Sequence, residues 1–220
     1  MKLKKIKIAI DSPAASGAGT ISKMLSKKYN LFYCDTGKIY RFFAFKLMKK
    51  NIKNKIKYLS QISKKIDLKK LQSKNLLNDQ VAFQASQIAK NLKVRKLAVK
   101  FQKRMAYKPP TKYAGSILDG RDICSVVVPD ADIKFYITAD VNTRAKRRFK
   151  EYQKSGKKVK YSEILKSMKK RDKEDRTRTH SKLKKTKDSY LINTTNLSIK
   201  SSFLKVKKIT DRRLNELWKK

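Results

Sequence analysis

The hydrophobic and polar positions of the first fifty residues alternate between two periods. Residues 5–11 alternate with period two, which predicts a strand. A loop of small residues follows over 12–19, and helical spacing then runs over 20–29. A short apolar run at 31–34 predicts a buried strand, and residues 37–50 return to helical spacing. This succession of strand, loop, helix, strand and helix is typical of a parallel α/β sheet.

The rest of the chain continues the same alternation. Three further apolar runs predict strands, at residues 116–118, 133–138 and 190–193. Helical patterns occupy residues 81–106, in two stretches joined near 91–93, then a segment from 140 onward, residues 161–176, and residues 198–218 with Ser198 as the expected cap. Residues 51–78 are rich in lysine and only weakly periodic, so we expect a mobile helical insert there rather than strands.

Composition narrows the class of protein. A chain of 220 residues with 40% hydrophobic residues is long enough for one α/β core. Cys34 and Cys124 are too few and too far apart for a disulfide framework or a zinc site, and His180, the single histidine, excludes histidine triads. No segment approaches the roughly 18 apolar residues of a membrane span, and the first apolar run is too short for a signal peptide. We therefore expect a cytoplasmic protein without a membrane partner.

The net charge of +42 admits two interpretations. One is a nucleic-acid or anionic-membrane partner. The other is a lysine-rich composition that decorates exposed faces, and this one is favoured because the lysines are spread along the whole chain and no RNA-binding signature accompanies them. We therefore expect no specific nucleic-acid partner, and only weak polyanion binding that falls steeply as salt rises.

The loop after the first strand has the features of a phosphate cradle. Such a cradle needs inward-facing backbone N–H groups, small residues and a helix N-terminus. The candidate ATP-binding residues are Ser12, Pro13, Ala14, Ala15, Ser16, Gly17, Ala18, Gly19 and Thr20. Compared with the pattern G-x-x-x-x-G-K-[ST], Ser12 replaces the first glycine and Ala18 replaces the lysine. By itself this loop is equally compatible with a small-residue turn in any α/β protein.

Five further segments resemble bacterial cytidylate kinases, in that family's order and over nearly the whole chain. They are D-T-G-K-I-Y-R from Asp35, A-S-Q-I-A from Ala85 with V-R at 94–95 and F-Q at 101–102, D-G-R-D-I-C-S-V-V-V-P-D-A from Asp119, R-D-x-x-D-R-x-R from Arg171, and N-T-T-N-L-S-I from Asn193. The resemblance implies a P-loop kinase fold, in which a five-stranded parallel sheet is flanked by helices and carries a small nucleoside-monophosphate-binding insert and a mobile lid. It places one domain over residues 1–220, with its core at 1–50, 107–150 and 186–220, the insert at about 51–106 and the lid at about 151–185.

The same resemblance implies transfer of the γ-phosphoryl group of ATP to CMP or dCMP. Mg²⁺ would arrive with ATP, with Asp35 near it at most, and the protein would be a monomer. Arginine suits this chemistry because its planar fork binds phosphate bidentately and keeps its charge. The implied CMP-binding residues are Asp35, Thr36, Arg41, Ser86, Arg95, Arg121, Asp122, Arg171, Asp175 and Arg178, and the implied catalytic residues are Arg41, Arg121, Arg147 and Arg148.

Within that set, the resemblance assigns different parts of CMP to different residues. Arg41 and Arg121 would hold the phosphate. Ser86, Arg95 and Arg178 would read the cytosine with Asp122 alongside, and Arg171 and Asp175 would reach the ribose. Two alternatives stay open: the arginines at 144, 147 and 148 also fit a solvated helix face, and Asp35 also fits a helix cap.

Ala18 is the main departure from the family pattern. In P-loop kinases the lysine at this place neutralises phosphate charge, and loss of one such cation costs on the order of 10²–10³ in rate. Either another cation substitutes, with Lys23, Lys38 or a lid arginine as candidates, or the chain binds nucleotides with little turnover. The rival functions are a kinase of another nucleoside monophosphate and a non-enzymatic, basic nucleotide- or RNA-binding protein.

Overall fold

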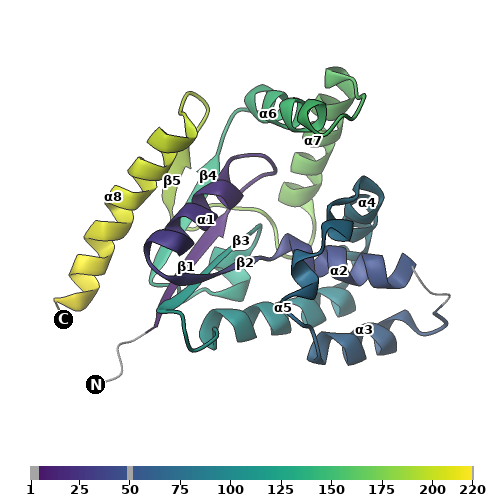
Figure 1. The fold of residues 1–220 in the computed structure, drawn as a ribbon, viewed down its shortest axis with the longest axis horizontal. Helices are drawn as coiled ribbons and strands as arrows, with labels where there is room; N and C mark the ends of the chain where they lie inside the picture. The colour runs from purple at the N-terminus through teal and green to yellow at the C-terminus, as the bar shows by residue number, and fades with distance from the viewer. Residues whose placement is uncertain (1–4, 49–51, 220) are drawn as a thin grey trace. The chain divides into compact units, whose positions relative to one another are not determined.

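A computed structural model of the chain describes residues 5–48 and 52–219. It contains one sheet of five parallel strands in the order β2-β3-β1-β4-β5 (Figure 1). The strands are β1 (Ile6–Asp11), β2 (Leu31–Asp35), β3 (Gly115–Gly120), β4 (Ile133–Thr138) and β5 (Tyr190–Asn193). The predicted α/β fold with a five-stranded parallel sheet is confirmed, and each of these strands lies where the apolar runs place it.

The register of the central strand brings the predicted chemistry to one edge of the sheet. Asp11, the last residue of β1, lies opposite Gly120 on β3 and opposite Tyr136 on β4. Because all three strands run in the same direction, the loops that follow them leave from the same edge. The small-residue loop after β1 and the D-G-R-D block at the end of β3 are therefore neighbours.

Two helices cover one face of this sheet. Residues of α1 (Ala18–Lys28) and α8 (Ile199–Trp218) share a core cluster with isoleucines of β1, β3, β4 and β5. Ile21 and Leu25 of α1 and Val206 and Leu214 of α8 follow the helical period, so each helix turns one apolar stripe inward. The side chain of Ser198 accepts a hydrogen bond from the backbone N–H of Ser201, as its predicted capping role requires.

The chain divides into two compact units, residues 1–33 with 110–220, and residues 34–109. The smaller unit is helical: α2 (Gly37–Met48) packs on α4 (Asp79–Ile88), and α3 (Lys55–Lys64) packs on α5 (Leu92–Tyr107). Between 52 and 84, within the described part of the chain, there are helices and short 3₁₀ turns and no strand, as the weak periodicity predicts. Lys49 and Lys50, the end of the predicted second helix, and Asn51 lie outside the described residues.

The larger unit also carries a helical pair, α6 (Val141–Lys154) and α7 (Tyr161–Thr177). Asp140 caps α6 by accepting hydrogen bonds from the N–H groups of Asn142 and Thr143. Ala145, Ile164 and Met168 form the buried cluster between the two helices. Within the described ranges, no helix combines the length and apolarity that a membrane span needs.

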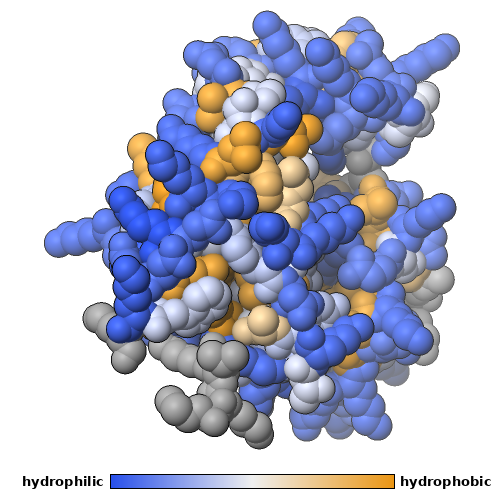
Figure 2. Space-filling view, turned by 60° about the vertical axis from the view of Figure 1, so that its left-hand side comes forward, coloured by the Kyte–Doolittle hydropathy of each residue, from blue (hydrophilic) through white to orange (hydrophobic). Residues whose placement is uncertain are grey.

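Hydrophilic side chains cover most of the face shown in Figure 2, and hydrophobic ones are scattered between them. This is the surface expected when lysines are distributed along the whole chain.

Candidate active site

The phosphate loop, residues 12–20, runs from the end of β1 into the first turn of α1 at the carboxyl edge of the sheet. At its start, the N–H of Ser12 donates to the carbonyl oxygen of Gly120 at 3.0 Å, which fixes the loop against the end of β3. At its end, Gly17 adopts φ of 91° and caps α1, which begins at Ala18. The loop thus ends at the N-terminus of an 11-residue helix, where unpaired N–H groups attract anions.

Two alanines of this loop are unusual, one in its backbone conformation and the other in its burial. Ala15 has φ of 58°, a left-handed conformation that costs an L-residue about 1 kcal/mol or more. Ala18 is 3% exposed and belongs to the core cluster beneath the sheet's central strands. The loop therefore keeps the backbone course of a phosphate cradle, but residue 18 contributes packing where a lysine would contribute charge.

A buried carboxylate ties the base of the phosphate loop to the D-G-R-D block. Asp11 is fully buried, and its two oxygens accept the N–H groups of Ile123 at 2.6 Å and Cys124 at 3.0 Å. These residues begin a short π-helical turn, Ile123–Val127, which the sequence did not predict. Burial raises the pKa of Asp11 to about 6, although the two backbone N–H groups act in the opposite direction.

The arginines predicted to bind the acceptor in the larger unit surround one carboxylate, Asp175. The Nε of Arg121 lies 2.8 Å from Oδ2 of Asp175, and Nη1 of Arg178 lies 3.4 Å from Oδ1. Arg171 is at 4.0 Å and half exposed. Burial acts to raise the pKa of Asp175, but the charges of Arg121, Arg171 and Arg178 outweigh it and the pKa is lowered. Asp122, next to Arg121, is buried.

The smaller unit holds the other predicted acceptor residues, and two of them are arginines fixed by carbonyl groups. Nη1 of Arg41 donates to the carbonyl oxygen of Leu76 at 2.8 Å. Arg95 is 6% exposed, donates to the carbonyl oxygen of Ala89 at 3.2 Å, and lies over the ring of Tyr40. Each guanidinium is therefore held in a defined position by its own unit.

The shorter predicted side chains of this unit make local contacts. The hydroxyl of Ser86 donates to the carbonyl oxygen of Phe83 at 2.7 Å, a bond within α4. Oδ1 of Asp35 accepts the N–H of Gly37 at 3.1 Å, so the capping contact considered for Asp35 is present at the start of α2. Thr36 is buried.

The lid arginines of α6 differ among themselves. Arg148 pairs with Glu151 at 2.9 Å and lies over the ring of Tyr152, and its side chain is 37% exposed. Arg147 donates to the carbonyl oxygen of Ser16 in the phosphate loop at 3.4 Å. A solvated helix face therefore describes Arg148 better than Arg147.

Of the two lysines named as substitutes for the missing cation, Lys23 belongs to the larger unit and Lys38 to the smaller one. Lys23 is exposed on α1. Nζ of Lys38 donates to Oε1 of Gln72 at 2.9 Å, within the smaller unit.

Comparison with known proteins decides the family. The cytidylate kinase family profile matches residues 8–211. The chain belongs to the cytidylate kinase family. Its members are nucleoside-monophosphate kinases, so the predicted family and enzyme class are both confirmed.

Individual relatives agree with this assignment. The chain is 43% identical over 206 residues to the cytidylate kinase of Bartonella tribocorum, which covers 91% of this chain and 92% of that protein. It is 38% identical over 210 residues to the cytidylate kinase of Rhizobium meliloti, which covers 95% and 97%. The crystal structure of an uncharacterized Eubacterium ventriosum protein has a TM-score of 0.54 at 18% identity, covering 94% of this chain and 98% of that one, a likeness of fold alone.

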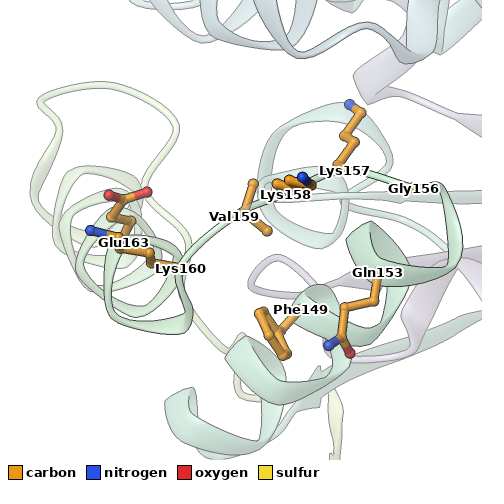
Figure 3. Close-up of a pocket in the computed structure, with 8 residues that line it drawn as sticks. All are labelled: Phe149, Gln153, Gly156, Lys157, Lys158, Val159, Lys160 and Glu163. Carbon is orange, nitrogen blue, oxygen red and sulfur yellow. The ribbon is translucent and has the colours of Figure 1, made fainter.

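This cytidylate kinase family member also has an open cavity of about 700 Å³ at the connection between α6 and α7. Figure 3 shows Phe149 and Gln153 on one side, and Glu163 across the cavity at the start of α7. Lys157, Lys158 and Lys160 complete a basic lining. None of the predicted ATP- or CMP-binding residues lines this cavity, so it is not the proposed substrate site.

Three residues of this site were not predicted from the sequence: Asp11, Asp172 and Thr194. Asp172 accepts two hydrogen bonds from the guanidinium of Arg144, and Thr194 is 1% exposed and contacts the phosphate loop. Asp172 and Thr194 lie inside two family-like blocks, which was the available signal for them. The sequence signal for Asp11 was weaker, because it is a single carboxylate at the end of an apolar strand.

Proposed function

We propose that this chain transfers the γ-phosphoryl group of ATP to CMP or dCMP. The observation that carries the proposal is the group of Arg121, Arg171 and Arg178 around Asp175, in the same unit as the phosphate loop. The Ser12–Gly120 hydrogen bond joins the loop to the end of β3, and Gly120 directly precedes Arg121 in the sequence. Phosphoryl transfer needs positioning and charge stabilisation above all, and rigidly held arginines supply both.

On the acceptor side, Asp175 orients guanidinium groups that would otherwise sample many rotamers. Nε of Arg121 donates to Asp175, and Nη1 donates to the carbonyl oxygen of Gly120 at 3.3 Å, so Nη2 is the part of that planar fork that we assign to a phosphate. We assign the phosphate of CMP to Arg121 and Arg41, and the cytosine edge to Arg178, Arg95 and Ser86, following the family resemblance. Asp122 and Arg171 would complete the acceptor contacts.

On the donor side, the N-terminus of α1 and the loop amides would bind the ATP phosphates. Arg148 is the exposed lid arginine that we assign to the donor phosphates. Mg²⁺ would arrive on ATP and neutralise phosphate charge. Mg²⁺ commonly keeps several water ligands and binds substrate phosphates, so we assign most of its ligands to phosphate and water. The carboxylate of Asp119, which lies beside Gly19, is an oxygen donor of suitable chemistry.

The loss of the loop lysine lowers the rate in this proposal without abolishing it. Backbone N–H groups and arginines remain, and in P-loop kinases these share the stabilisation of the transferring group with the lysine. Acceptor arginines held this specifically have no use in a protein that binds only polyanions, which disfavours the non-enzymatic alternative.

Release of ADP tests the proposal. Purified protein is given ATP and Mg²⁺ with CMP, dCMP, UMP or AMP in turn, and ADP is followed by a coupled assay with chromatography of the products. We expect CDP and dCDP to form faster than UDP, and no second ADP from AMP. Absence of ADP at high enzyme concentration with every acceptor would contradict the enzymatic proposal, and a preference for UMP or AMP would contradict the choice of CMP.

A further inference from the structure

The phosphate loop of this chain is held from outside by residues of α6, α7 and the segment after β5. In a phosphate cradle the N–H groups face the ligand, so several carbonyl groups face away and need other partners. Nη1 of Arg144 donates to the carbonyl oxygen of Ala14 at 3.2 Å. The carbonyl oxygen of Ser16 accepts from Arg147 at 3.4 Å and from the hydroxyl of Thr194 at 2.8 Å. Two outward-facing carbonyls of the loop are thereby satisfied.

Arg144 is fixed in place by a buried ion pair. Arg144 is 2% exposed. Its Nη1 and Nη2 donate to the two carboxylate oxygens of Asp172 on α7, at 3.2 and 2.5 Å. Nε donates to the carbonyl oxygen of Ala139, just before α6, at 2.8 Å. The guanidinium therefore connects α6, α7 and the loop with defined geometry, and its charge is balanced by Asp172.

Arg147 differs from Arg144 in whether an acidic side chain neutralises its positive charge. Nη1 and Nη2 donate to the hydroxyl and the carbonyl oxygen of Thr194 at 3.1 and 2.7 Å, and Nη1 also reaches Ser16. Across residues 5–48 and 52–219, no carboxylate pairs with Arg147. Burial lowers its pKa, but an arginine stays charged at neutral pH. An unneutralised positive charge thus lies directly behind the loop.

Apolar contacts reinforce the polar ones. Ala14 and Ala15 pack against the cluster of Ala145, Ile164 and Met168 between α6 and α7. The left-handed conformation of Ala15 therefore coincides with packing of its partly buried methyl group against the helical pair. The loop rests on α6 and α7 through both kinds of contact.

We propose that Arg147, supported by Thr194 and the Arg144–Asp172 pair, is a positioning residue. It holds the lysine-less phosphate loop in its ATP-binding shape and supplies positive charge through the loop backbone. Preorganising the loop spares ATP the cost of ordering it, so the residue acts on ATP affinity without touching ATP. This proposal rests on the proposed function only in requiring that ATP binds at the loop.

The test compares Arg147→Gln with Lys146→Gln. Both remove one positive charge from α6, but Lys146 is exposed and lies beside Arg147 in sequence. Binding of Mg·ATP and of CMP is measured by isothermal titration calorimetry, and the melting temperature of each variant is recorded. We expect Arg147→Gln to raise the Kd for ATP at least tenfold while the Kd for CMP stays within twofold. Lys146→Gln should leave both within twofold.

Three milder variants keep the test decisive if Arg147→Gln does not fold. Arg147→Lys should retain the charge and weaken ATP binding about threefold. Thr194→Val should weaken it about as much, and Thr194→Ser should not. Equal ATP affinity in Arg147→Gln or Arg147→Lys and the wild type would overturn the proposal. So would equal weakening of ATP and CMP accompanied by a lower melting temperature, because that is what a merely structural role predicts. ATP binding is the readout, so the test decides this proposal even if the wild type forms no CDP, an outcome that contradicts only the proposed function.

Discussion

The phosphate loop and the arginine block around Asp175 lie in the same unit, but they match the family pattern in different ways. The loop matches it in the course of its backbone, and the block matches it in its side chains. The loop has lost side chains of the usual pattern, with Ser12 and Ala18 in place of glycine and lysine, yet its backbone still runs from β1 into the N-terminus of α1. The block retains its guanidinium and carboxylate groups, with Arg121 and Arg178 on one acid. A site that binds through its backbone tolerates side-chain replacement if neighbours hold its shape. A site that binds through planar charged forks does not.

The largest expected effect is a loss of kcat/KM on substitution of an arginine in the block around Asp175. Arg121→Lys keeps the charge but loses the fork that binds Asp175 and phosphate together. We expect kcat/KM for CMP to fall about 10²–10³-fold, or roughly 3–4 kcal/mol. Arg212→Lys, on the exposed face of α8, should leave it unchanged in the same coupled assay. A fall of less than fivefold would remove Arg121 from the proposed site.

Asp175→Asn removes the carboxylate that holds the arginines together. Three positive groups would then face one another without a counter-charge, so we expect the free energy of unfolding at pH 7 to fall by about 3 kcal/mol. The pKa of Asp175 is lowered in the folded state, so its stabilisation is present above the unfolded pKa and disappears as the pH falls through the folded one.

Urea denaturation at pH 7 and pH 3 measures this difference. The gap between the wild type and Asp175→Asn should shrink at the lower pH. Glu216→Gln, which breaks exposed pairs on α8, should cost less than about 1 kcal/mol at either pH. A gap that is independent of pH would show that Asp175 does not act through its charge.

Asp11 lies at the base of the loop and binds backbone N–H groups directly after the D-G-R-D block. Its contribution to stability changes with pH in the direction opposite to that of Asp175. Its pKa is raised to about 6 in the folded state, so the wild type should lose stability as the pH rises from 4 to 6. The loss relative to Asp11→Asn should be about 2 kcal/mol over that window. Urea denaturation of both proteins at several pH values measures it. If the difference between them instead grew in the wild type's favour with rising pH, the two backbone N–H groups would outweigh the burial.

Ala18→Lys restores the cation on the loop side. A lysine there should raise kcat about tenfold, or about 1.4 kcal/mol, less than a full lysine effect because this loop is arranged around a buried methyl. Ala18→Met, of similar length and without charge, is the matched control and should not raise kcat. An equal gain in both variants, or none in a folded Ala18→Lys, would break the argument that charge is what the loop lacks.

The smallest expected effect concerns the loop backbone. Ala15→Gly relieves a left-handed alanine, which favours the folded state by about 1 kcal/mol, but it also removes a methyl group packed on α6 and α7. We expect a net change in the free energy of unfolding within about 0.5 kcal/mol. A loss above 2 kcal/mol would mean that the methyl contact, and not backbone conformation, dominates at this position.

The sequence predicted the fold well because its signals are local. The strands β4 and β5 were placed at residues 133–138 and 190–193, where the structure has them, since each is a short apolar run between polar segments. The π-helical turn at Ile123–Val127 was missed because its apolar residues carry no such signal, and because its N–H groups are bound by Asp11, 112 positions earlier. A contact at that separation has no trace in local periodicity.

The site was predicted as a set of residues, and the contacts among them were not. The family-like blocks identified Arg121 and Asp175 by their letters, but not that one binds the other. The bond between Thr194 and Ser16 joins positions 178 residues apart. The hydrogen bonds of Arg147 to Thr194 and to the carbonyl oxygen of Ser16 also join distant segments, and its assignment to phosphate stays a prediction. The CMP-binding roles assigned to residues of the two units stay predictions.

The most direct test of the account is transfer of labelled γ-phosphate from ATP to CMP by the wild-type chain, with Arg121→Lys as the matched blank. The account predicts labelled CDP from the wild type, at a rate at least 10²-fold above the blank. No labelled CDP from the wild type above a reaction without protein, at saturating ATP and CMP, would contradict the claim that a phosphate loop without its lysine still supports this reaction.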